Sequence, residues 1–214
     1  MNFSLIEILA AGSATLAVLM CGITSLKAQL QALACQTALF AGICVLVGIQ
    51  QHAEHFLILA LVIFLLKAIG IPLFLGWSSQ RMGIQRDTGV TLNPGITLMM
   101  GFGALLAGYF LTPQFAVQSA GNPICAGISL ALLFIGMLLM ITRRLAISQV
   151  VGFLVMENGI FLYGLTQTHG MPHLVEMAAI FEVLIAVLIA GLVIFRINRS
   201  FEHIDVSKMR TLRH

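Results

Sequence analysis

The chain contains seven apolar stretches, each about 20 residues long and nearly free of charged side chains. A helix of that length spans the roughly 30 Å hydrocarbon core of a bilayer. Because hydrocarbon offers no partner for backbone polar groups, apolar runs of this length favour transmembrane helices. We therefore predict an all-α integral membrane bundle of seven transmembrane helices. They are expected at 3–25, 30–50, 55–77, 92–112, 122–142, 146–168 and 172–196.

The composition leaves little room for a soluble domain, because 59% of the residues are hydrophobic and only 9% are charged. A net charge of +3 is spread over several loops and therefore does not indicate a nucleic-acid partner. We expect a multi-pass protein of a bacterial inner membrane, surrounded by lipid. It divides into a four-helix N-terminal part (1–112), a three-helix part (122–196) and a basic cytoplasmic tail (197–214).

The basic residues occupy alternate ends of the predicted spans. The loops around 51–54, 113–121 and 169–171 contain no lysine or arginine. By the positive-inside rule, this asymmetry predicts an N-terminus outside and a C-terminus in the cytoplasm. Only Lys67, inside the third span, departs from the pattern. The residues that obey the pattern are Lys27, Arg81, Arg86, Arg143, Arg144, Arg196, Arg199, Lys208, Arg210 and Arg213.

Several ionisable side chains lie within the predicted spans. Glu157, next to Asn158, falls at the middle of the sixth span, while Glu176 and Glu182 lie in the seventh. Ionisable residues at such depth are costly and usually serve ion or proton transfer. Burial disfavours the ionised carboxylate, which allows proton exchange near neutral pH. We therefore predict a proton path through Glu157, Glu182 and Asn158, with Glu176 as a further candidate that solvent or its own helix start could instead account for.

Lys67 lies equally deep in the third span, five residues before Pro72. Since Pro72 cannot donate to the carbonyl of Ala68, the helix is expected to weaken just beyond the lysine. A broken helix beside a buried lysine suits a hydrated charge path. A purely structural role is the alternative, in which Lys67 neutralises one of the glutamates.

The sequence shows no catalytic residue and no cofactor or metal site. Four cysteines fall inside apolar stretches without a C-x-x-C motif, as expected of small packing residues. They are Cys21, Cys35, Cys44 and Cys125.

The last third of the chain resembles the component E membrane subunit of hydrogenase-4 and formate-hydrogenlyase-type complexes. The resemblance rests on Gly-Phe-Leu-Val-Met-Glu-Asn-Gly at 152–159, Leu-Val-Glu-Met at 174–177, and Glu182. The last three spans are also similar to NADH-quinone oxidoreductase subunit K and to the small K-like protein of Mrp-type antiporters. In subunit K, two consecutive helices each carry a membrane glutamate. Those positions correspond here to Glu157 and to Glu182, or alternatively Glu176.

The resemblance implies a non-catalytic subunit in the membrane arm of a group 4 NiFe hydrogenase-like complex. Peripheral hydrogenase subunits would carry the NiFe centre and iron–sulfur clusters, and antiporter-like membrane subunits would carry protons or sodium ions. Three alternatives stay open: an Mrp-type cation/proton antiporter subunit, a structural membrane subunit with inert buried ion pairs, and a self-contained transporter or receptor.

Overall fold

A computed structural model of the chain describes residues 3–52, 54–81, 86–87, 92–115, 122–167 and 191. Within these residues every regular element is a helix, which confirms the all-α prediction. The elements are α1 (Phe3–Gly22), α2 (Leu26–Gln51), α3 (Glu54–Val62), the π-helix η1 (Ile63–Gly70), α4 (Ile71–Arg81), α5 (Pro94–Phe115), α6 (Pro123–Thr142) and α7 (Ala146–Gln167).

Six helical segments in the described part of the chain are long and apolar enough to cross a membrane. They match the first six predicted spans, and α3, η1 and α4 together form the third. The predicted seventh span, 172–196, and the tail 197–214 lie outside the described residues. The chain is a multi-pass membrane protein.

The second span begins earlier than the predicted residue 30, because three glutamines suggested a polar start. Instead, α2 begins at Leu26. The side chain of Gln29 is buried and donates to the backbone carbonyl of Ile23 at 2.7 Å. This bond places the amide where a helix packs against the preceding turn. The polar residue therefore belongs to the interior of the bundle.

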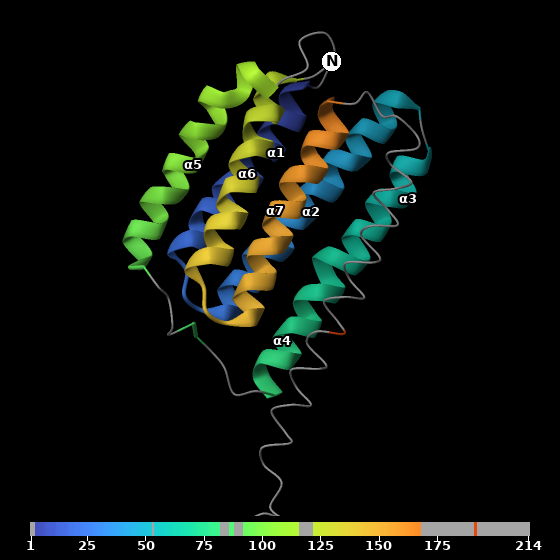
Figure 1. Cartoon of the computed structure of the whole chain (residues 1–214). Coiled ribbons are helices and arrows are strands. Elements are labelled where there is room, and N and C mark those ends of the chain that lie inside the picture. Colours follow the sequence, from blue (N-terminus) through green and yellow to red (C-terminus); the bar gives the residue numbers. More distant parts are fainter. Residues whose placement is uncertain are drawn as a thin grey trace, which may run out of the picture.

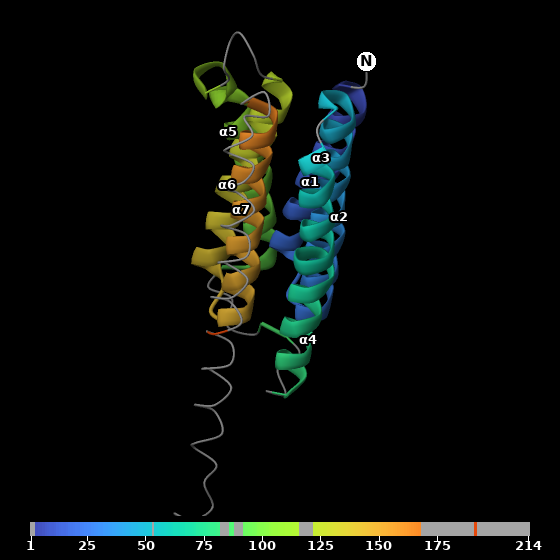
Figure 2. The same cartoon turned by 90° about the vertical axis from the view of Figure 1, so that its right-hand side faces the viewer.

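The described helices form two layers (Figure 2). One layer contains α5, α6 and α7, and the other contains α1, α2 and the α3–η1–α4 span (Figure 1). The turns that carry basic residues, between α1 and α2 and between α6 and α7, lie at the same end as the last residues of α4. The charge asymmetry seen in the sequence therefore corresponds to one physical end of the bundle.

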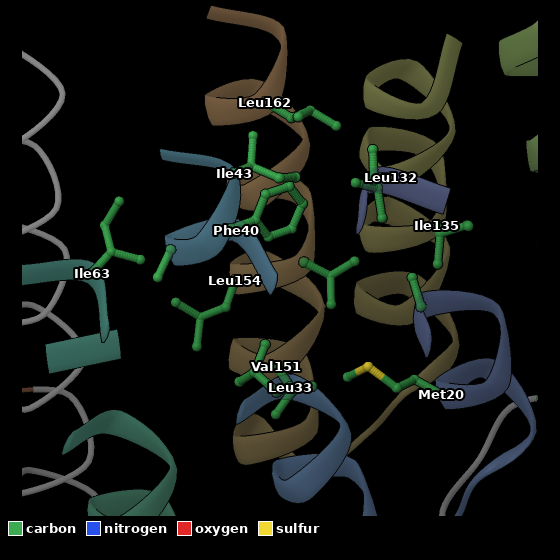
Figure 3. Close-up of a cluster of buried hydrophobic side chains, with 14 of the residues drawn as sticks. Met20, Leu33, Phe40, Ile43, Ile63, Leu132, Ile135, Val151, Leu154 and Leu162 are labelled. Carbon is green, nitrogen blue, oxygen red and sulfur yellow. The ribbon is translucent and has the colours of Figure 1, made fainter. Parts of the chain in front are cut away.

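The core lies between the two layers and is built from side chains of both (Figure 3). Phe40 of α2 is 1% exposed and lies among residues of α7 and η1. Burial here orders the helices relative to one another. Lipid already removes water from the outer faces, so tight packing is the main force between the layers. The labelled core residues are Met20, Leu33, Phe40, Ile43, Ile63, Leu132, Ile135, Val151, Leu154 and Leu162.

Glycine allows α6 and α7 to approach closely. A Cβ atom at Gly136 would lie 2.5 Å from the backbone nitrogen of Met156, and one at Gly159 would lie 2.8 Å from the carbonyl oxygen of Ser129. Neither position has room for a side chain. This contact fixes how deep α7, and therefore Glu157, sits beside its neighbours.

Candidate functional site

A buried ion pair joins the third span to the sixth. Lys67 Nζ lies 3.1 Å from Glu157 Oε2, and the two side chains are 2% and 6% exposed. Of the five residues predicted for a proton path, these two are brought into direct contact. The sequence left the partner of Lys67 open, and the structure assigns it to Glu157.

Both residues lie near the middle of their helices, far from either end of the bundle. Glu157 is central in Ala146–Gln167, and Lys67 is central in the span Phe56–Arg81. Neither charge can reach the membrane surface by extending along the helix, as a terminal lysine would. The charges therefore meet each other at mid-depth.

The helix around Lys67 is a π-helix over eight residues, Ile63–Gly70. The backbone N–H of Ile71 donates to the carbonyl of Leu66, five residues back, as the π pattern requires. Pro72, which has no N–H, follows immediately. The distortion was predicted beyond the lysine, but it contains Lys67 instead. The missing donor at Pro72 acts on the turn before it.

The π-helix also determines which face is buried. Within Ile63–Gly70, Ile63, Lys67 and Ala68 are buried. Spacings of four and five residues place such positions above one another where backbone bonds run to the fifth residue. Lys67 is thereby held on the inward face with Ile63, which belongs to the hydrophobic core. The local backbone thus directs the ammonium group into the bundle.

Asn158 makes a separate contact in the same region. Its Nδ2 donates to Thr37 Oγ1 of α2 at 3.4 Å, and both side chains are at most 1% exposed. The residue before Thr37, Gln36, donates through Nε2 to the backbone carbonyl of Ser13 at 3.2 Å. These contacts extend buried polar groups from α7 through α2 to α1. Thr37 and Gln36 were not predicted as site residues, because polar residues in α2 were assigned to its weak start.

The pair is electrostatically self-sufficient but demanding. Burying two opposite charges together avoids the far larger cost of burying one alone. A proton that binds Glu157 would cancel the carboxylate charge and leave Lys67 as an uncompensated cation. The two protonation states of Glu157 therefore differ strongly in how they hold Lys67. Such a pair can be a static clamp or a charge-dependent switch.

A second buried charge, Arg143, lies at the basic end of the bundle. It is 2% exposed, and its Nη2 donates to the carbonyls of Met20 and Cys21 at 3.0 Å each. Burial lowers the pKa of Arg143, and the neighbouring Asp87 carboxylate partly opposes that shift. Asp87 is itself 2% exposed, and its N–H donates to the carbonyl of Thr24 at 3.0 Å. The sequence placed Arg143 only in a basic loop, and nothing in it marked Asp87.

Two of the predicted path residues, Glu176 and Glu182, lie outside the described residues. Their relation to Glu157 stays a prediction. Within the described part of the chain, no three His, Cys, Asp or Glu side chains gather as a metal site. Cys21, Cys44 and Cys125 are buried, whereas Cys35 is exposed.

Comparison with known proteins places the chain among membrane subunits. The family of NADH-ubiquinone/plastoquinone oxidoreductase chain 4L matches residues 124–214, which include Glu157. An uncharacterized protein of Mycobacterium tuberculosis, Rv0085, is 32% identical over 99% of this chain and 98% of its own length. Hydrogenase-4 component E of Escherichia coli K12 and that of Shigella flexneri are each 23% identical, over 84% of both chains. No solved structure matches the chain.

Proposed function

Because this chain belongs to the family of hydrogenase-4 component E, we propose that it serves in the membrane arm of a group 4 NiFe hydrogenase-like complex. Family membership indicates a membrane subunit of a complex I-like assembly, with other membrane-arm subunits as partners. The subunit holds no redox group in this proposal. Peripheral hydrogenase subunits carry the NiFe and iron–sulfur centres, and antiporter-like subunits move ions.

The observation that carries a transport role is the Lys67–Glu157 pair at mid-membrane. Redox events in partner subunits alter the charge or hydration near Glu157. A proton delivered to its carboxylate weakens the attraction for Lys67, and loss of that proton restores it. Asn158, Glu176 and Glu182 continue the path in this proposal. The π-helix supports it, since such helices frequently occur at functional sites.

The proposal includes seven spans, with the N-terminus outside and the C-terminus cytoplasmic in a bacterial inner membrane. The basic end of the bundle, which contains Lys27 and Arg144, then faces the cytoplasm. Cysteines introduced at 27 and at 52 test this orientation. An impermeant maleimide applied to sealed cells should label position 52 and not position 27, and the reverse pattern would overturn the assignment.

Two alternatives make different predictions. An Mrp-type antiporter subunit would purify with antiporter subunits and no hydrogenase subunits. A structural subunit with an inert ion pair is favoured by the same 3.1 Å contact, because a fixed pair needs no proton transfer. Mass spectrometry of the complex purified in mild detergent separates the first alternative. Charge substitutions separate the second.

The deciding experiment measures proton transport by purified, reconstituted complexes that carry Glu157→Gln, Lys67→Met or both. Removing both charges removes the buried imbalance, so the double variant should assemble like the unaltered complex. A proton carrier predicts that transport stays at least tenfold reduced in the double variant. An inert pair predicts that assembly and transport recover together, which would refute the proposed path.

Glu7 provides a matched control in the same chain. It lies in α1 and accepts a hydrogen bond from Asn122 Nδ2 at 2.8 Å, at the end of the bundle away from the basic turns. Glu7→Gln removes a helix carboxylate without touching the Lys67–Glu157 pair. Transport should remain within about twofold of the unaltered complex. A loss as large as that of Glu157→Gln would show that any change of helix charge is damaging.

A further inference from the structure

A groove of about 860 Å³ lies between α2 and the η1–α4 segment. Its mouth, at the basic end of the bundle, is lined by Ser25, Lys27 and Arg86. Farther in, its walls include Ala34 and Ala68. The groove therefore changes along its length from cationic and polar to apolar.

Small residues and a proline create the hollow. A Cβ atom at Gly76 would come within 3.7 Å of Leu30 on the facing helix, so the absent side chain leaves a gap there. Pro72 and Leu73 line the same wall, and Leu73 is 68% exposed. In a chain that spans the membrane, an exposed leucine at this position faces lipid. The groove is therefore accessible from the side, through the bilayer.

The two cations at the mouth are not neutralised by the acidic residue nearest in sequence. Arg86 is exposed and forms an isolated antiparallel bridge with Ser25, which fixes it beside the start of α2. Asp87, the next residue, points inward, where it is 2% exposed and interacts with Arg143. Among the described residues that line the groove, none is acidic. Lys27 and Arg86 therefore present a double positive charge.

We propose that this groove binds one anionic phospholipid. The phosphate lies between Lys27 and Arg86, and the first part of an acyl chain follows Leu30, Ala34 and Gly76 inward. From Lys27 to Ala34 the helix rises roughly 10 Å at 1.5 Å per residue, about the length of eight methylene groups. Basic sites between membrane helices on the cytoplasmic side suit anionic head groups. A free phosphate would leave the apolar walls unused, and a neutral quinone would leave the cations unused.

Native mass spectrometry of the full chain, delipidated in mild detergent and titrated with phosphatidylglycerol or phosphatidylcholine, tests the proposal. We expect one phosphatidylglycerol to bind at least tenfold more tightly than phosphatidylcholine. Lys27→Gln with Arg86→Gln should abolish that preference. Arg144→Gln is the control, because Arg144 is an exposed cation at the same end that does not line the groove.

Four outcomes would overturn the proposal. They are equal affinity for the two lipids, unchanged binding by the Lys27/Arg86 double variant, an equal loss in Arg144→Gln, and full competition by inorganic phosphate at millimolar concentration. Circular dichroism of each variant verifies that it is folded. None of these results depends on transport, so the lipid site and the proposed proton path can fail separately.

Discussion

Lys67 and Glu157 meet at mid-depth although their helices belong to different layers of the bundle. The third span alone would bury a cation, and the sixth alone would bury an anion. Their contact makes each span a condition for the other. It links folding of the first half of the chain to that of the part that matches chain 4L.

A double-mutant cycle on this pair should give a large coupling energy. Lys67→Met and Glu157→Gln each leave one buried charge without its counterion, so each should lower the free energy of unfolding by roughly 3–5 kcal/mol. The double variant should recover most of that loss. Unfolding of the chain in detergent, followed by circular dichroism, measures all four proteins. Additive losses would mean that the contact contributes no coupling.

Arg143 and Arg144 are adjacent arginines with opposite environments, since Arg143 is 2% exposed and Arg144 lies on the surface. Arg143→Met removes two hydrogen bonds to α1 and the cation beside Asp87, and should cost about 3 kcal/mol. Arg144→Met should stay within about 0.5 kcal/mol. Thermal unfolding of both variants provides the comparison. Equal shifts in the midpoint would contradict the buried role of Arg143.

Gly136→Ala should weaken the contact between α6 and α7. The new methyl group would meet the backbone of Met156 and force the helices apart, at a cost of about 1–3 kcal/mol. Gly103→Ala is the matched control, since a Cβ atom there meets nothing within 4 Å. Its stability should be unchanged or slightly raised, because alanine favours helix. If both alanines prove equally tolerated in chemical unfolding, the close approach is not required.

Pro72→Ala should change the π-helix rather than merely the local stability. The new N–H can bond to the carbonyl of Ala68, which favours an ordinary α-helical turn and rotates Lys67 away from Glu157. The coupling energy of the pair should fall by about 1 kcal/mol or more in this background. Pro113→Ala, in α5, replaces a proline within an α-helix and should leave the coupling intact. An unaltered coupling in Pro72→Ala would show that Pro72 does not maintain the π-helix.

The spans were predictable because residence in a bilayer depends on local hydrophobicity, which a single sequence displays directly. Pairing of helices was not, since it depends on packing between distant segments. Glu157 was identified as a candidate from its depth, but its choice of Lys67 required the two layers to be placed. The sequence equally could not separate Arg143 from Arg144, because burial of one depends on where α1 ends. Pro72 signalled a distortion without showing on which side of Lys67 it would fall.

The π-helix around Lys67 solves a problem peculiar to proteins in hydrocarbon. A loop or an open break at mid-membrane would expose backbone groups that lipid cannot satisfy. A π-helix instead alters the angular register of the side chains while each carbonyl still finds a donor five residues on, up to the position of Pro72. Returning Ile63–Gly70 to α-helical register would swing the ammonium group around the helix axis, with both ends of the span held in place. The third span thus has the geometry of a rotary joint, with Glu157 as its stop.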